Sequence, residues 1–256
     1  MIATKIVRKG IAALGLAVMA TLAVIDMARA QGGNIYQATL AEPNQKTQEV
    51  STEQVRRILA DGSAIILDAR KRSEYVAGHI PEARNVDATS PASVAAVERL
   101  VSGDKNKALV LYCNGPFCRA SRQLGEQLVA AGFSNVRRYQ LGIPIWRALG
   151  GPTEVELEGI LRIYKVDQTA VFFDARSAEE FAKGSLPGAH NVPGDKLTSD
   201  GLQKAPLPRD DFNTRIVLFG RDSAQARTLA DAFSKIPWHN VTYFPGTFET
   251  LRAAIK

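Results

Sequence analysis

Short apolar segments alternate with amphipathic segments along most of the chain. Continuous apolar runs at 64–67 and 109–112 have the length and composition of buried strands. Apolar residues three or four positions apart at 120–131 predict a helix, which Gly132 would end. A capping-box pattern at 51–54 marks the start of another helix. This alternation predicts an α/β fold with a largely parallel central sheet and helices on both faces.

The other elements expected between residues 64 and 149 follow the same alternation. They are a helix that begins at Ser73, helices at 91–101 and 145–149, and a strand at 135–139. The order of elements then repeats at an offset of 106 residues, since 171–176 matches 65–70 and 184–189 matches 78–83. A period near 100 residues indicates a duplicated domain rather than a solenoid. We place the boundary at 150–153, which gives domains at 48–152 and 153–256.

The first 30 residues differ from the rest of the chain. Three basic residues within the first nine precede an uncharged 15-residue stretch, and Ala28-Arg29-Ala30 follows as a small-x-small cleavage site. This pattern predicts a secretory signal peptide at 1–30, and the uncharged stretch is shorter than the roughly 20 residues of a membrane span. An uncleaved N-terminal anchor is the alternative. After cleavage we expect a periplasmic or secreted protein without stable membrane insertion, in which 31–47 is a polar, flexible lead-in.

Composition and charge exclude some classes of function. The chain has 256 residues, 45% of them hydrophobic, and a net charge of +6, as is ordinary for a globular protein. Residues 31–256 carry +3, because the first 30 residues hold four basic residues and one acidic residue. No basic run is present, so nucleic-acid binding has no support. Three scattered histidines and two cysteines five positions apart do not form a metal-site pattern.

The candidate chemistry lies in the loop between the strand at 109–112 and the helix at 120–131. This loop reads Cys113-Asn-Gly-Pro-Phe-Cys118-Arg119. A cysteine that follows a strand and precedes a helix lies where backbone N–H groups and the helix dipole favour the thiolate, so we expect a lowered pKa for Cys113. Arg119 adds a permanent charge with a planar fork that suits an oxyanion. A nucleophilic sulfur facing an anionic substrate is the hypothesis; a buried apolar cysteine or a plain disulfide is the alternative.

The second copy lacks these residues. Gly220 stands where Cys113 stands, and Ala226 stands where Arg119 stands. A domain without a nucleophile cannot form a covalent intermediate, so we expect an inactive structural partner. Asp68 and Arg70 recur in this copy, which indicates a structural role for the pair, and His79 is interpreted as a hydrogen-bonding structural residue.

The order Asp68-Ala69-Arg70, then Gly-His-Ile-Pro-Glu-Ala at 78–83, then strand, cysteine loop and helix, resembles the rhodanese family of sulfurtransferases. The resemblance covers about residues 48–256 as a tandem pair. It implies two three-layer α/β domains, each with a central, mostly parallel sheet flanked by helices. It also implies an active first copy, in which Cys113 carries a persulfide, and an inactive second copy.

The resemblance further implies a substrate class and a binding loop. Cys113 would take sulfane sulfur from a small anionic, thiosulfate-like donor and pass it to a thiophilic acceptor such as cyanide or a thiol. Neither a metal nor an organic cofactor is implied. Loop N–H groups at about 114–119 would stabilise the persulfide anion. The residues expected to bind substrate are Asn114, Gly115, Phe117, Cys118 and Arg119.

Two features of the loop leave other functions open. Arg119 follows Cys113 by six positions, and this spacing is similar to that of the dual-specificity phosphatases of the cell-cycle type. A phosphatase or an arsenate-reductase-like enzyme is therefore the second hypothesis. Cys118 lies within the loop, so the third hypothesis is a redox module in which Cys113 and Cys118 cycle between dithiol and disulfide.

Overall fold

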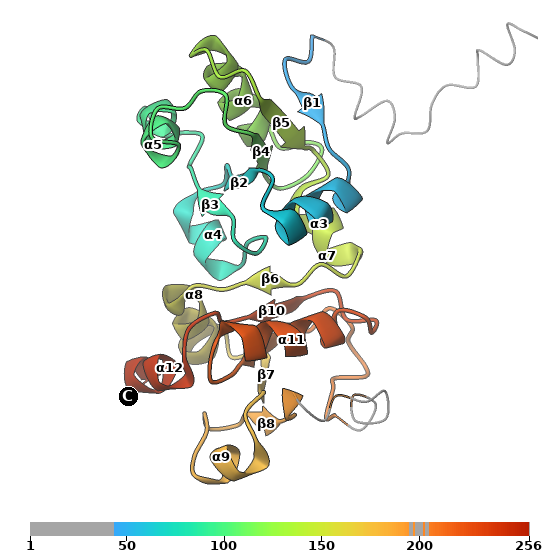
Figure 1. Ribbon diagram of the computed structural model, residues 1–256. Helices are drawn as coiled ribbons and strands as arrows, with labels where there is room; N and C mark the ends of the chain where they lie inside the picture. Colours follow the sequence, from blue (N-terminus) through green and yellow to red (C-terminus); the bar gives the residue numbers. More distant parts are fainter. Residues whose placement is uncertain (1–43, 195–196, 198–201, 203–204, 256) are drawn as a thin grey trace, which may run out of the picture. The chain divides into compact units, whose positions relative to one another are not determined.

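The structure is a computed structural model that describes residues 44–194, 197, 202 and 205–255. The predicted signal peptide and residues 31–43 of the predicted lead-in lie outside these residues. No helix within the described ranges combines the length and the apolar character that crossing a bilayer requires. Two five-stranded sheets, each flanked by helices, follow one another along the chain (Figure 1). The predicted α/β fold, with its duplication, is confirmed.

The first sheet has the strand order β1-β5-β4-β2-β3, and its strand pairs are parallel. The elements of this half are β1 (Gln48–Glu49), α3 (Thr52–Asp61), β2 (Ile65–Asp68), α4 (Arg72–Ala77), β3 (Arg84–Asn85), α5 (Ser93–Leu100), β4 (Leu109–Tyr112), α6 (Ala120–Ala130), β5 (Val136–Tyr139) and α7 (Gly142–Ala148). The capping box is present, since the Ser51 and Gln54 side chains each accept the other's backbone N–H. Gly62 then ends α3 in the left-handed conformation.

Side-chain alternation along β4 divides the core of this half into two layers. Leu109, Leu111 and Cys113 point to one face and pack with Leu124 and Leu128 of α6. The intervening residues of β4 point to the other face and pack with α3 and α7. Because the period of a strand is two, the first loop residue continues the first face, and the sulfur of Cys113 is directed toward α6.

The second sheet repeats this topology with the order β6-β10-β9-β7-β8, again with parallel pairs. Its elements are β6 (Thr153–Glu154), α8 (Leu157–Arg162), a π-helical turn η1 (Ile163–Asp167), β7 (Val171–Asp174), α9 (Ala178–Ala182), β8 (His190–Asn191), β9 (Ile216–Phe219), α11 (Ser223–Phe233), β10 (Val241–Tyr243) and α12 (Phe248–Ile255). Two apolar clusters again lie on the two faces of the sheet.

Two helix boundaries differ from the predictions. The helix expected at 91–101 is shorter and spans Ser93–Leu100. The helix expected at 145–149 begins three residues earlier, at Gly142. Pro144 therefore falls in its first turn, where the N–H that proline lacks has no partner within the helix.

The two halves are joined by a short antiparallel bridge. His79 and Glu154 exchange backbone hydrogen bonds of 2.9 and 2.8 Å, and the His79 ring lies 3.3 Å from the Glu154 carboxylate. The ring also bonds the Tyr75 carbonyl and stacks on the Tyr75 ring at 3.7 Å. Burial raises the pKa of Glu154, but hydrogen bonds from His79 and Tyr243 reverse this effect and the net pKa is lowered. His79 thus makes the contacts of a structural residue at the junction.

Candidate active site

The Cys113 loop is held between the end of β4 and the start of α6. Gly115 adopts a φ of +102°, which a residue with a side chain rarely adopts. The carbonyl of Cys113 accepts the N–H of Ile143 at 3.1 Å, which fixes the loop to α7. A Cβ added to Gly142 would lie 2.3 Å from that carbonyl oxygen, so only glycine permits this approach. The strand–loop–helix arrangement predicted for the cysteine is confirmed.

The sulfur of Cys113 is buried, with 2% of the residue exposed. It donates to the carbonyl oxygen of Cys118 at 3.3 Å and lies 3.3 Å from the hydroxyl of Ser121. The N–H of Ser121, in the first turn of α6, also faces the sulfur. The sulfur therefore has one carbonyl acceptor on the loop side and hydroxyl and N–H groups on the helix side.

The expected low pKa of Cys113 is wrong for this conformation. Burial, and after it the neighbouring side chain of Cys118, raise the pKa of the Cys113 thiol to about 11, against a reference of 9.0, although the Ser121 groups lower it. The hydroxyl and N–H of Ser121 favour the thiolate, but desolvation of the thiolate is the larger effect. One of the expected anion donors is also engaged, since the N–H of Cys118 bonds the Gly115 carbonyl at 3.0 Å. The loop as described thus stabilises a neutral thiol.

The predicted substrate-binding residues are only partly brought together. Gly115 is buried and Cys118 packs against the same apolar cluster as Cys113. The side chain of Asn114 donates to Glu74 of α4 at 2.5 Å. Phe117 is 86% exposed, and Arg119 is exposed as well. Within the described part of the chain, the Arg119 side chain has no hydrogen bond or ion pair, so its fork is available to a ligand.

Asp68 and Arg70 belong to a buried network of hydrogen bonds. Two guanidinium nitrogens of Arg70 bond the Asp68 carboxylate, the shortest distance being 2.6 Å, and the guanidinium also donates to the Gly78 carbonyl. The hydroxyl of Tyr112 donates to Asp68 at 2.6 Å and accepts the N–H of Ile80 at 3.0 Å. The carboxylate is thus satisfied inside the protein, which supports the structural interpretation of this pair.

The second half builds the same network with different donors. Asp174 and Arg176 form the equivalent ion pair at 2.6 Å. Phe219 is the counterpart of Tyr112 and has no hydroxyl, and Ser185, the counterpart of His79, donates to Asp174 instead at 2.6 Å. Gly220 takes the place of the cysteine, and directly after it the N–H of Arg221 donates to the Gln225 side chain at 2.8 Å. The second loop is therefore closed by a side chain of its own helix.

Sequence reasoning missed two residues of the site. Ser121 contacts the sulfur, and its place in the first turn after the cysteine loop is a signal that could have identified it. Gly142 permits α7 to approach the loop, but nothing near it in the sequence indicates that function. Its neighbours in space are about 30 residues away along the chain, so only the fold shows the contact.

In a comparison with known proteins, the family profile described as Rhodanese-like domain matches residues 51–149 and 156–254 of this chain. A thiosulfate sulfurtransferase from Pseudomonas entomophila is 33% identical over 99 residues, which are 39% of this chain and 84% of that protein. A tRNA uridine(34) hydroxylase from Buchnera aphidicola is 26% identical over 141 residues, which are 55% of this chain and 41% of the hydroxylase. The chain thus spans about two fifths of the length of the hydroxylase.

Among solved structures, a thiosulfate sulfurtransferase from Pseudomonas aeruginosa is 24% identical, with a TM-score of 0.40. That match covers 83% of this chain and 45% of the other. A 3-mercaptopyruvate sulfotransferase from Escherichia coli is 21% identical, with a TM-score of 0.36, and the match covers 79% of this chain and 99% of the other.

Proposed function

Because this chain belongs to the rhodanese family, with two rhodanese-like domains in tandem, we propose that it is a sulfurtransferase in which only the first domain is active. The observation that carries this proposal is the position of Cys113, at the end of a buried strand and facing the first turn of α6. The second domain has Gly220 at the equivalent place and serves as a structural partner. We further propose, from the N-terminal sequence, that the protein is exported to the periplasm or secreted.

The proposed reaction has two steps, and each transfers one sulfur atom. The Cys113 thiolate attacks the outer sulfur of a thiosulfate-like donor, the sulfur–sulfur bond of the donor breaks, and sulfite leaves with the bonding electrons. A thiophilic acceptor such as cyanide then attacks the outer sulfur of the Cys113 persulfide. Thiocyanate forms and the Cys113 thiolate is regenerated, so the cycle needs no other oxidant or reductant. Arg119 holds the anionic donor at the rim of the loop.

The raised pKa of Cys113 requires a change in the loop during this cycle. A thiol with a pKa of about 11 is almost fully protonated at neutral pH, so Cys113 passes its proton to solvent water before it attacks the donor. The carbonyl of Cys118 repels a sulfur anion and turns away, while the hydroxyl and N–H of Ser121 remain in place to stabilise it. The closed loop thus keeps the sulfur neutral, and a change in the loop makes the thiolate available for attack.

Mass spectrometry of the intact protein after exposure to thiosulfate tests this function. The full chain should gain the mass of one sulfur atom, and cyanide should remove that mass as thiocyanate forms. The Cys113→Ser variant should gain nothing, whereas the matched Cys118→Ser variant should still gain one sulfur. Persulfide formation without Cys113 would contradict the assignment. Hydrolysis of an aryl phosphate that depends on Cys113, with no persulfide, would instead support the phosphatase hypothesis.

A redox role for the two cysteines is the second candidate. Both cysteines are free thiols, and the sulfur of Cys113 contacts the backbone of Cys118. The side chain of Cys118 also lies close enough to the Cys113 sulfur to raise its pKa, so a disulfide would join two neighbours within one tight loop, and a strained bond of this kind is easily reduced. Mild oxidation should then abolish activity, thiol reductant should restore it, and Cys118→Ser should resist the loss. Two free thiols and intact activity after oxidation would exclude this gating.

A further inference from the structure

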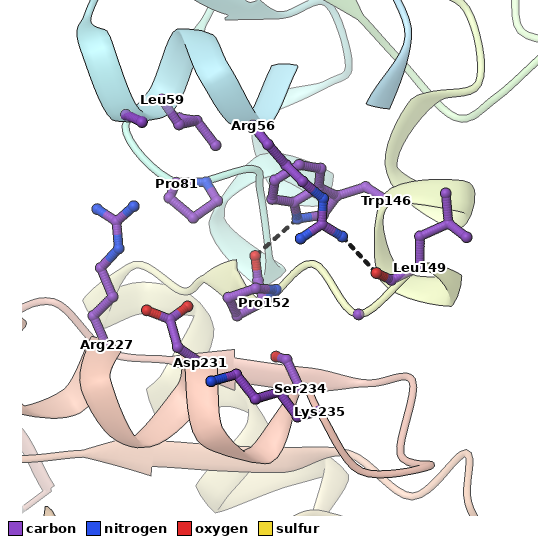
Figure 2. A pocket seen from close by; sticks show the side chains of 12 residues that line it. Arg56, Leu59, Pro81, Trp146, Leu149, Pro152, Arg227, Asp231, Ser234 and Lys235 are labelled. Atoms are coloured by element: carbon purple, nitrogen blue, oxygen red, sulfur yellow. Dashed lines mark hydrogen bonds between the residues drawn. The ribbon is translucent and has the colours of Figure 1, made fainter. Parts of the chain in front are cut away.

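A cavity of about 510 Å³ lies between the two halves, away from the Cys113 loop (Figure 2). Its walls come from α3, from the C-terminal end of α7 and the segment that follows it, and from α11. Gly150 closes one side, since a Cβ added there would lie 2.6 Å from the carbonyl oxygen of Ser234. The volume is within the range of sites that hold small organic molecules.

Basic side chains dominate the wall of this cavity. Arg56 from the first half and Arg227 and Lys235 from the second half line it, against one carboxylate, that of Asp231. Burial raises the pKa of Asp231, and the positive charges of Arg227, Lys235 and Arg56 oppose that rise, so all three cations lie near this carboxylate. The lining side chains thus carry a net charge of +2.

Neighbouring carboxylates neutralise only part of this charge. Arg227 donates to Glu82 at 2.7 Å, outside the cavity wall. Glu53 lies 3.7 Å from Arg56 Nε, and its side chain is 76% exposed, so water and salt screen that pair. The described residues hold no ion pair of Lys235. With Glu82 counted, a net charge of +1 is left on the lining, and Arg56 and Lys235 bring positive charge to the cavity from the two halves.

Two buried polar atoms at the cavity have no hydrogen-bond partner. They are Nε of Arg56 and Oγ of Ser234. The Arg56 guanidinium is positioned by a bond from Nη2 to the carbonyl of Leu149 and by its place 5.4 Å from the centre of the Trp146 ring. Figure 2 shows Arg56 pointing into the cavity from one side and Ser234 and Lys235 from the other. Buried donors without partners are costly, and an anionic group bound in the cavity would offer an acceptor to these donors.

We propose that this cavity binds a small organic acid, through its carboxylate or phosphate group, and that the acid bridges the two halves of the protein. Arg56 Nε and Ser234 Oγ donate hydrogen bonds to the anionic group, and Lys235 adds charge at close range. Asp231 accepts a hydrogen bond from a hydroxyl group elsewhere on the ligand. This site is separate from the sulfur chemistry of Cys113 and does not depend on the proposed function.

Calorimetric titration of the full chain with succinate and with inorganic phosphate tests the proposal and distinguishes the two kinds of anionic group. At least one of them should bind, whereas succinamide, a neutral analogue of succinate, should not. Lys235→Gln and Ser234→Ala should each weaken binding by about tenfold, which corresponds to one charge-assisted hydrogen bond of about 1.4 kcal/mol. Lys107→Gln, which removes an exposed charge elsewhere, is the matched control and should bind as the unmodified protein does.

Thermal unfolding supplies a second measurement in case a variant is unstable. A ligand that binds only the folded protein raises the melting temperature by an amount that grows with the logarithm of ligand concentration over Kd, so the rise should shrink in Ser234→Ala and remain in Lys107→Gln. Absence of binding by both anions would overturn the proposal. Binding that Lys235→Gln and Ser234→Ala leave unchanged would also overturn it, because the anion would then occupy another site, such as the Cys113 loop.

Discussion

The ionisation of Cys113 can be measured directly, and its expected value follows from the contacts of the sulfur. Burial and the Cys118 side chain raise the pKa of Cys113 from 9.0 to about 11, and this difference corresponds to about 3 kcal/mol against the thiolate. At pH 8 about one thiol in a thousand is then ionised, compared with about one in ten without the shift. Because the thiolate is the reactive form, alkylation should be about a hundredfold slower than for an unshifted cysteine.

The assay is the rate at which iodoacetamide labels Cys113 in the unmodified chain as pH is varied, with the Cys113 and Cys118 labels resolved by mass spectrometry, because the Cys118 side chain is one cause of the shift. The rate should rise about tenfold for each pH unit, without a plateau below about pH 10. Ser121→Ala removes a hydroxyl that lowers the pKa, so the labelling rate should fall further, by about fivefold for a hydrogen bond of about 1 kcal/mol. Ser134→Ala is the control, because that hydroxyl bonds Asn106 on the surface.

The same shift predicts how stability depends on pH. The folded protein holds the Cys113 proton more tightly than the unfolded chain, so the free energy of unfolding should fall as pH rises from about 9 through about 11. Other groups titrate in this range, so the comparison is with Cys113→Ser, which should lack up to about 3 kcal/mol of that fall. A labelling plateau below pH 8, or identical pH dependence in the two proteins, would refute the reasoning, because the helix dipole would then outweigh burial.

Three further predictions concern the loop, the second domain and the buried network. Arg119→Lys keeps the charge but loses the fork, so the thiosulfate concentration at half-maximal rate should rise about tenfold with little change in melting temperature; an unchanged concentration would refute its role. Gly220→Cys in a Cys113→Ser background should show no cyanide-dependent thiocyanate release, and robust release would contradict the inactive second domain. Tyr112→Phe should lower the free energy of unfolding in urea by about 2–3 kcal/mol, because the hydroxyl donates to the buried Asp68 carboxylate, and an equal midpoint in both proteins would argue against this.

Much of the fold could be predicted from the sequence, because the relevant signals are local. Apolar runs of four residues became β2, β4 and β7, and the capping box at Ser51 became the start of α3. Burial of strands and capping of helices depend on residues a few positions apart, so the sequence carries them directly. The duplication was visible for the same reason, since each copy repeats its own local pattern.

The position of Cys113 was also predictable, whereas its chemical state was not. That it lies between a buried strand and a helix follows from the order of elements, and so does the contact with the first turn of α6. The raised pKa follows from the way the loop folds back, which buries the sulfur and brings the Cys118 side chain close to it. Such desolvation depends on atoms brought together by packing, which no spacing of residues indicates.

The cavity between the halves shows most clearly which features the sequence predicts and which only packing decides. In the sequence, Arg56 is one basic residue on an amphipathic helix, and Ser234 and Lys235 follow another helix about 180 positions later. None of them belongs to a motif. The antiparallel bridge of His79 with Glu154 links the halves, and Gly150 lets the backbone pass close to Ser234. Local patterns therefore determined each domain by itself, and only tertiary packing decided which side chains face each other, because burial and charge proximity are properties of distance in space.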